Sequence, residues 1–293
     1  MSNAFRVLIT GANGQLGWEL QRCAPTGTQV LAVDSQVLNI TDRARIDEVA
    51  NKNLPHVIIN CAAYTAVDKA EQERELAYAV NAQGAENLAL AARHLGAKFI
   101  HLSTDFIFDG RQSRPYAATD IPAPLGVYGA SKLAGEQRVM AAYDRSVIVR
   151  TAWVYSAHGH NFVKTMLRLM RERDEVRVVA DQIGTPTWAH HLAQALWTVV
   201  NSQLQGVYHY TDAGVASWYD FAVAIYEESR NIGLLSREVA VRPIRAVDYP
   251  TPATRPAFAV LDKTAMWSVP GITSAHWRIG LRQMLQELTK TSV

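Results

Sequence analysis

Tyr128 and Lys132 lie four residues apart in the segment Y-G-A-S-K. Residues at this spacing share one face of a helix, so the phenol and the ammonium can converge. A free phenol, with a pKa of about 10, is a slow acid at neutral pH, and a neighbouring cation lowers that value. Such a pair can give a proton to the alkoxide that forms when hydride reduces a ketone. The spacing is common by chance, so the assignment depends on its surroundings.

Glycines recur at every third position directly after the first β-branched run, at Gly11, Gly14 and Gly17. In a turn between a strand and a helix, glycine lets the backbone approach a pyrophosphate, which binds at the N-terminus of the helix. The spacing differs from the commoner G-x-G-x-x-G, and an ordinary strand–turn–helix junction is the alternative. Its position after the first strand favours a dinucleotide site.

Asp34 ends the second apolar run, about where an acidic side chain binds the adenosine ribose 2′-hydroxyl of NADH. Arg43 and Arg45 follow soon afterwards and could instead bind the 2′-phosphate of NADPH. The sequence therefore predicts NADPH or NADH as the cofactor without deciding between them. An ordinary turn residue is the alternative for Asp34.

Small and polar residues follow the third and fourth apolar runs. Residues 60–63, N-C-A-A, leave room for a cofactor beside the backbone. Thr104 and Asp105 fall at the carboxyl edge, where doubly wound folds bind their ligands. We expect Thr104 to donate a hydrogen bond to a substrate carbonyl beside Tyr128, unless it only caps a turn. Asn81 could hold the catalytic helix or a water, or form a plain buried hydrogen bond.

Short strands alternating with helices must position these residues. Strand-like runs are Arg6–Thr10, Gln29–Asp34, His56–Asn60, Lys98–Leu102 and Ser146–Arg150. Helical patterns cover 14–23, 41–52 with Thr41 or Asp42 as the cap, and a long segment with one face formed by Leu76, Val80, Gly84, Leu88, Ala91 and Leu95. We expect close packing at Gly84. Buried strands with helical crossovers predict an α/β fold, a doubly wound parallel sheet of Rossmann type.

The second half predicts a smaller, interleaved substrate-binding lobe. Its expected elements are helices at 161–173, 190–201, 217–229 and near 281–289, a strand at 177–180 and a proline-rich stretch at 243–256. We assign residues 1–155 to a dinucleotide-binding domain, with strand and helix contributions from about 175–215. Residues 156–293 then form mainly the substrate-binding lobe.

The composition excludes several classes of protein. A net charge of +2 with no basic run gives no case for a nucleic-acid partner, and no apolar stretch is long enough for a membrane span. Met1–Phe5 lead into a strand without the features of a signal peptide, so we expect a cytoplasmic protein. Cys23 and Cys61 are expected to be reduced core thiols.

Seven longer motifs carry a resemblance that covers nearly the whole chain. They are residues 11–19, 62–71, 103–110, 127–136, 150–155, 181–187 and 250–256. With these motifs the chain resembles the dTDP-4-dehydrorhamnose reductases, a family of the extended short-chain dehydrogenase/reductase superfamily. The resemblance implies reduction of the 4-keto group of dTDP-6-deoxy-L-lyxo-4-hexulose to give dTDP-L-rhamnose, with a nucleotide sugar as the substrate.

By motif position the resemblance also implies roles for single residues. The catalytic residues would be Tyr128 as proton donor, Lys132 lowering its pKa, and Thr104 binding the carbonyl. Cofactor contacts would come from Gly11, Gly14, Gln15, Leu16, Gly17, Asp34, Ala62, Ala63, Thr65, Tyr128 and Lys132. The sugar nucleotide would contact Thr104, Asp105, Trp153 and Arg255. Arg255 suits a diphosphate, although it could instead anchor the proline-rich loop.

One position departs from the family. Some members bind Mg²⁺ at a dimer contact through carboxylates, one of which matches Glu19, whereas the other position is His190 here. Imidazole is a poor ligand for Mg²⁺, so we expect no metal site, a possible homodimer, and Glu19 facing the partner or pairing with a protonated His190. His158 and His160 are expected to be solvated, and Trp218 to belong to the core.

Two other functions fit the same scaffold. A nucleotide-sugar epimerase or dehydratase would retain bound NAD⁺, because its reaction begins with an oxidation. A non-catalytic nucleotide-binding regulatory subunit, such as that of methionine adenosyltransferase, would need no proton donor. The presence of Thr104, Tyr128 and Lys132 together argues against the regulatory role.

Overall fold

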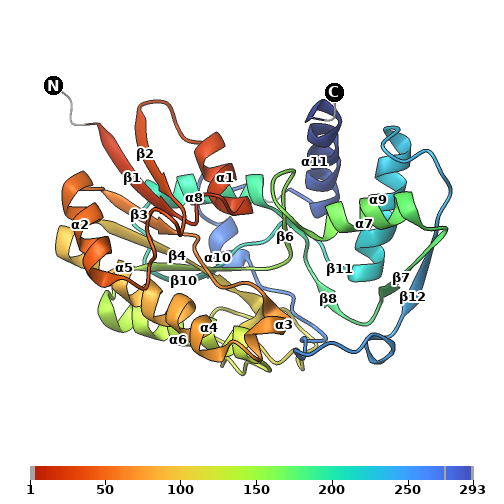
Figure 1. Cartoon of the computed structure of the whole chain (residues 1–293), viewed down its shortest axis with the longest axis horizontal. Helices are drawn as coiled ribbons and strands as arrows, with labels where there is room; N and C mark the ends of the chain where they lie inside the picture. Colours follow the sequence, from red (N-terminus) through yellow and green to blue (C-terminus); the bar gives the residue numbers. More distant parts are fainter. Residues whose placement is uncertain (1–3, 274, 292–293) are drawn as a thin grey trace.

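The central element is a parallel six-stranded sheet. The computed structural model describes residues 4–273 and 275–291. The strands of this sheet are β1 (Phe5–Thr10), β2 (Thr28–Val33), β3 (Val57–Asn60), β4 (Lys98–Thr104), β5 (Val147–Thr151) and β10 (Gly206–His209). Their order is β10-β5-β4-β3-β1-β2, and every neighbouring pair is parallel (Figure 1). The doubly wound α/β fold is confirmed; β10 is the strand that the sequence pattern did not single out.

Helices cover both faces of the sheet. On one face lie α1 (Gln15–Arg22) and α8 (Ala189–Val200), whose apolar residues share a core with β1, β3, β4 and β5. On the other face lie α2 (Arg43–Asn53), α5 (Ala85–Leu95) and α6 (Val127–Ala142), which bury a second core. Helix α2 begins at Asp42, whose carboxylate accepts from the Arg45 amide at 3.0 Å. Because the strands are parallel, each strand ends and the following helix begins at the same edge of the sheet, which is the edge where we expect the site.

The long helical pattern is interrupted by a π-helical segment. Helix α4 (Arg74–Tyr78) leads into six π-helical residues, Ala79–Gly84, which continue as α5. A π turn holds more residues than an α turn, so the residues of α4 face a different direction from the one that a continuous α-helix would give them. The expected burial of Leu76 is therefore wrong: this residue is 50% exposed. The close packing expected at Gly84 is confirmed, because a Cβ there would lie 2.6 Å from Ile40.

The smaller lobe is built from the later part of the chain. Its core combines α7 (Phe162–Glu172), α9 (Trp218–Asn231) and α11 (Trp277–Thr291) with the paired strands β7 (Glu175–Val179) and β12 (Ala240–Ile244). Two short pairs join it to the sheet, β6 (Val154–Tyr155) with β9 (Thr187–Trp188) and β8 (Ile183–Gly184) with β11 (Ala216–Ser217). Helix α11 begins earlier than expected. None of the helices within the described residues is long and apolar enough to cross a membrane.

Candidate active site

The glycine turn connects β1 to α1 and touches the end of β3. Gly11 has a φ of +73°, and a Cβ on it would lie 2.6 Å from the Ala62 amide nitrogen. A Cβ on Gly17 would lie 2.2 Å from the Gly11 carbonyl oxygen. Gly14 is the N-cap of α1 and offers no side-chain cap, so amides of the first helical turn stay available. The turn therefore fits a pyrophosphate at the start of α1.

Asp34 lies beside this turn and is held in place. Its carboxylate accepts from the Asn13 side chain at 2.6 Å and from the amides of Gln36 and Val37. Arg43 and Arg45 do not point to it but form surface ion pairs within their own helix, with Asp47 and Glu48. The two arginines would therefore have to leave these ion pairs to bind a 2′-phosphate.

Asn81, in the π-helical segment, connects the loop after β3 to helix α6. Its carbonyl accepts from the Tyr64 amide at 2.8 Å, and its amide donates to the Tyr64 carbonyl and to the Ser131 hydroxyl. Ser131 in turn donates to the Tyr128 carbonyl at 2.8 Å. A Cβ on Gly135 would lie 2.1 Å from the backbone carbonyl oxygen of Asn81, so glycine lets α6 approach this backbone. Asn81 thus forms buried hydrogen bonds that tie α6 to the segment at Tyr64.

Lys132 lies on α6 one turn after Tyr128 and is almost fully buried. Its ammonium donates to the Leu102 carbonyl of β4 at 2.6 Å. Burial lowers the pKa of Lys132 to about 8, although the Glu136 carboxylate opposes this change. This hydrogen bond to β4 fixes the Lys132 ammonium at the carboxyl edge of the sheet.

The Tyr128 phenol hydrogen-bonds with Thr104 at the end of β4. Phe106 packs edge-on against the Tyr128 ring at 5.5 Å, and Gly129 allows α6 to approach the Phe106 carbonyl. Burial raises the pKa of Tyr128 to about 12, although the Thr104 hydrogen bond acts in the opposite direction. The expectation that Lys132 lowers this pKa is therefore wrong for the protein without ligands: burial sets the direction, and the Lys132 ammonium is engaged with the Leu102 carbonyl. The phenol is protonated at neutral pH.

Asp105 continues the same chain of hydrogen bonds and is only 2% exposed. Its Oδ1 accepts from the Thr104 hydroxyl at 3.0 Å. Within the described part of the chain, its Oδ2 is buried without a hydrogen-bond partner. Burial raises the pKa of Asp105 from 3.8 to about 7. A buried polar oxygen without a partner, next to a cavity, is suited to bind a hydroxyl of a ligand.

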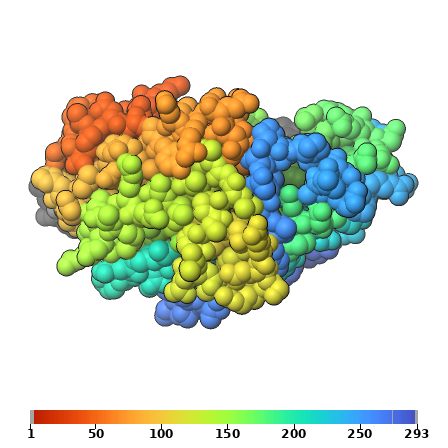
Figure 2. Space-filling model, turned by 90° about the horizontal axis from the view of Figure 1, so that it is seen from below, coloured from red at the N-terminus to blue at the C-terminus, as the bar shows by residue number. Residues whose placement is uncertain are grey.

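A cavity of about 610 Å³ opens beside Asp105, between the sheet and the smaller lobe. Its walls include Trp153, Trp218, Arg177 and Arg255. Trp153 has a φ of +47° and stacks on Trp218 with the ring centroids 3.5 Å apart. The expectation of a plain core role for Trp218 was therefore incomplete. Figure 2 shows a side of the molecule where the surface is hollowed between the blue C-terminal segment and the green segment of the smaller lobe.

Arg255 lies on the cavity wall and is also bound within the protein. Its guanidinium donates to both oxygens of the Asp68 carboxylate, at 3.1 and 2.8 Å, and to the Ala253 carbonyl. This pair joins the proline-rich loop to the start of helix α3 (Val67–Ala70). The loop-anchoring alternative is thus present in the geometry, and a diphosphate would share this guanidinium with Asp68.

The structure tests the expectations for Glu19 and His158. Glu19 is fully buried within the single chain, where it accepts from Ser156, so of its two expected arrangements the contact with His190 is present, at 3.2 Å. His158 is half-buried and not simply solvated: it stacks on Trp18, and its Nε2 lies 3.0 Å from the Asn13 carbonyl oxygen. These partners lie more than a hundred residues away in the sequence.

Comparison with known proteins supplies the family. Residues 5–290 match the family described as "RmlD substrate binding domain". A dTDP-4-dehydrorhamnose reductase of Aggregatibacter actinomycetemcomitans is 42% identical over 95% of this chain and 98% of its own. That of Escherichia coli is 39% identical over 98% and 99%. The chain belongs to the dTDP-4-dehydrorhamnose reductase family. The resemblance predicted from the seven motifs is confirmed.

Solved structures of dTDP-4-dehydrorhamnose reductases have the same fold. The Bacillus anthracis protein, crystallised in complex with NADP, superimposes with a TM-score of 0.92 at 40% identity over 96% of this chain and 99% of that one. A Thermus thermophilus UDP-glucose 4-epimerase superimposes with a TM-score of 0.81, but at 20% identity. At that identity the epimerase shows only that the scaffold is shared.

Asp105→Asn should raise stability at high pH. Because the folded-state pKa of about 7 lies above the ordinary 3.8, the carboxyl stabilises the fold fully below 3.8 and loses that contribution as pH rises through 7. Asparagine stays neutral throughout. We expect the variant to melt at a higher temperature than wild type at about pH 8, with the difference vanishing near pH 4. Thermal unfolding across this range is the measurement; a difference independent of pH would contradict the burial argument.

Proposed function

We propose that this protein reduces the 4-keto group of dTDP-6-deoxy-L-lyxo-4-hexulose to give dTDP-L-rhamnose, with NADPH or NADH as the hydride donor. The observation that supports it most is the convergence of Thr104, Tyr128 and Lys132 at the carboxyl end of β4, beside the cavity at Asp105. The family membership gives the substrate. We further propose that it acts in the cytoplasm, and a homodimer stays a prediction that sedimentation can test.

Tyr128 would act as the proton donor. Hydride adds to the carbonyl carbon with both electrons of its bond, the C=O π electrons move to oxygen, and the phenol proton transfers to that oxygen. An alkoxide is about as basic as hydroxide, and water itself has a pKa of about 15.7, so a phenol with a pKa of about 12 still donates readily. For the phenolate left behind to be stabilised by Thr104, the Thr104 hydroxyl would turn its hydrogen from the Asp105 carboxyl to the phenolate oxygen.

Thr104 and Lys132 would position the reacting groups. Thr104 can bind the carbonyl oxygen while it contacts the phenol, and Lys132 is held by Leu102 at the edge where the nicotinamide ribose would lie. When bound, the cofactor supplies the hydride. The residues that we propose to hold it are Gly11, Gly14, Gln15, Leu16, Gly17, Asp34, Ala62, Ala63, Thr65, Tyr128 and Lys132. The residues that we propose for the sugar nucleotide are Thr104, Asp105, Trp153 and Arg255.

Supplying the 4-keto sugar nucleotide together with each cofactor tests the proposal. Nicotinamide absorbance should fall in step with the appearance of the rhamnose product, identified by mass spectrometry and NMR. A purified protein that carries tightly bound NAD⁺ and interconverts sugar nucleotides without net oxidation of added NADPH would instead support the epimerase alternative. A protein that binds the nucleotide sugar without turnover would support the regulatory one.

We expect both cofactors to be used, with kcat/KM values within about tenfold of each other. Asp34 disfavours a 2′-phosphate, whereas Arg43 and Arg45 can leave their surface ion pairs for one at a cost of at most about 1 kcal/mol each. Asp34→Ala should then shift the preference towards NADPH. Steady-state kinetics with both cofactors measures this, and a wild-type preference far above tenfold would show that one group dominates.

A further inference from the structure

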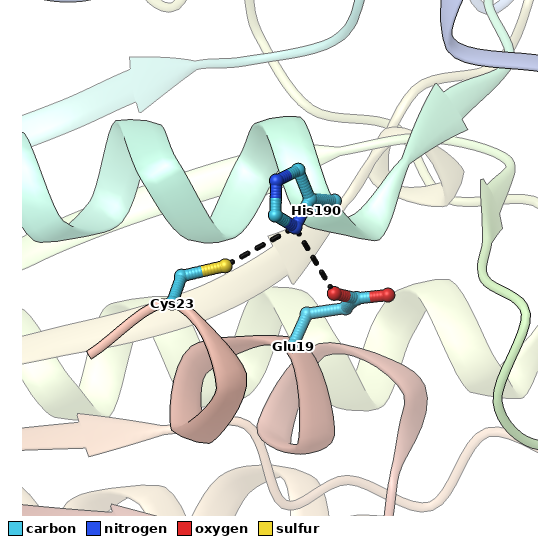
Figure 3. A group of neighbouring side chains, drawn as sticks. All are labelled: Glu19, Cys23 and His190. Carbon is cyan, nitrogen blue, oxygen red and sulfur yellow. Dashed lines mark hydrogen bonds and ion pairs between the residues drawn. The ribbon is translucent and has the colours of Figure 1, made fainter. Parts of the chain in front are cut away.

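Glu19, Cys23 and His190 form a compact cluster between helices α1 and α8 (Figure 3). Glu19 and Cys23 are one helical turn apart, at the end of α1, and so lie on one face of it. His190 projects from the first turn of α8, which packs on α1. Its Nδ1 lies 3.2 Å from the Cys23 sulfur and 3.2 Å from the Glu19 Oε2. Three different metal-binding groups therefore meet at one point.

The chemistry of this set does not suit Mg²⁺. Magnesium prefers an octahedron of oxygens at about 2.0–2.1 Å, and here one thiol and one imidazole stand with a single carboxylate. Sulfur and imidazole nitrogen are instead the ligands of zinc and of similar transition metals. A carboxylate and a thiolate would together neutralise a divalent ion. The three residues therefore do not suit Mg²⁺, but they fit zinc and similar transition metals.

The spacing is close to that of a tetrahedral site. Bonds of about 2.0–2.1 Å to nitrogen, 2.0–2.2 Å to oxygen and 2.3 Å to sulfur place such ligand atoms about 3.3–3.6 Å apart. The two measured separations from the His190 Nδ1 are both 3.2 Å, and all three ligand atoms lie within 4.8 Å of one another. An ion would need shifts of a few tenths of an ångström at these two contacts.

The surroundings leave one carboxylate oxygen for an ion. Ser156 donates to the Glu19 Oε1 at 2.8 Å, which orients the Oε2 towards His190. Arg22 competes for this place, since its guanidinium lies 2.7 Å from the Oε2 and 3.0 Å from the His190 Nδ1. The same guanidinium also binds Glu287 at 2.8 Å, near the surface. For an ion to bind, the guanidinium has to leave Glu19 and His190 while it keeps its ion pair with Glu287.

We propose that Glu19, Cys23 and His190 bind one transition-metal ion of the zinc class within a single chain, cross-linking helices α1 and α8. Burial raises the pKa of the Cys23 thiol to about 11, so the ion must displace a proton. Water could complete the coordination. The inference goes beyond the proposed function and does not depend on it, because none of the three residues is assigned to the reaction.

Cobalt is the probe for this site. The full-length protein, reduced and freed of metal with a chelator, is titrated with Co²⁺ alone and followed by ultraviolet–visible absorption. We expect one Co²⁺ per chain, a thiolate-to-cobalt charge-transfer band and the intense visible bands of tetrahedral cobalt. Zn²⁺ should displace the cobalt, and excess Mg²⁺ should not. Zn²⁺ should also raise the melting temperature as its concentration increases, while chelation leaves turnover intact.

Four variants separate this site from other thiols and histidines. Cys23→Ser should remove the charge-transfer band, and His190→Gln should weaken cobalt binding by at least about tenfold. The matched controls are Cys61→Ser at the other cysteine and His160→Gln at an exposed histidine, and both should bind cobalt as the wild type does. A wild-type protein without the band would overturn the proposal. So would a band that survives Cys23→Ser or disappears in Cys61→Ser.

Discussion

Replacing Tyr128 with phenylalanine should lower turnover by roughly 10²–10⁴-fold, the usual contribution of a general acid. The phenyl ring keeps its edge-on contact with Phe106 and its place on α6, so the affinity for NADPH and NADH should stay close to wild type. Only the proton that would reach the alkoxide is removed. Steady-state turnover and fluorescence titration of the cofactor measure the two quantities separately.

Tyr143→Phe is the matched control for this variant. Tyr143 lies at the other end of the same helix, where it is the C-cap of α6. Removing its hydroxyl should leave turnover unchanged. If the Tyr128 variant reduced the ketone at the wild-type rate, another group would have to supply the proton. If both variants lost activity together, the loss would reflect helix stability and not acid catalysis.

Arg150→Met should destabilise the fold by about 3–5 kcal/mol, because it leaves a buried charge without its partner. The Arg150 and Glu136 side chains are each only 5% exposed and meet at 2.7 Å. Arg150 also donates to the Ala118 carbonyl at 3.1 Å. Urea unfolding gives the change in the free energy of unfolding. Restoring neutrality with the second substitution Glu136→Gln should recover a large part of the loss.

The control for this prediction is an exposed ion pair. Arg168 and Glu172 are four residues apart on α7 and both more than half exposed. Arg168→Met should cost at most about 1 kcal/mol. Equal losses at Arg150 and Arg168 would show that burial does not govern the cost. Because the Glu136 carboxylate acts to raise the pKa of Lys132, the Arg150 variant also tests how far this ion pair affects the lysine that we propose for catalysis.

Local patterns were sufficient for the scaffold and for the residues at its edge. Gly11, Gly14 and Gly17 predicted the turn because their backbone requirements are set within a few residues. Thr104 and Lys132 were found because strand ends and helix spacing fix which side chains meet. The five strands predicted in the first half and the strand predicted at 177–180 are all present, and Asp42 caps α2 as one of the two expected residues.

What the sequence could not predict depends on distant partners. The π-helical turn that exposes Leu76 follows from how Asn81 reaches Tyr64 and Ser131, and no short pattern encodes that network. The stack of Trp153 on Trp218 joins segments far apart in the chain. Whether the pKa of Tyr128 is raised or lowered depends on how deeply the phenol is buried, and a sequence motif does not contain that information. Each of these required the packed structure.

The last strand of the sheet has a consequence for the way the protein is made. Strand β10 pairs with β5 at one edge, and α8 covers one sheet face, yet both are encoded well after Thr151. A ribosome adding about 5–20 residues per second needs several seconds to pass from β5 to β10. During that time β5 lacks its partner strand, and the sheet face that α8 will cover is covered only in part, by α1. A gene fragment that stops near residue 155 would therefore yield an aggregation-prone product, and the two lobes must be inherited and expressed as one unit.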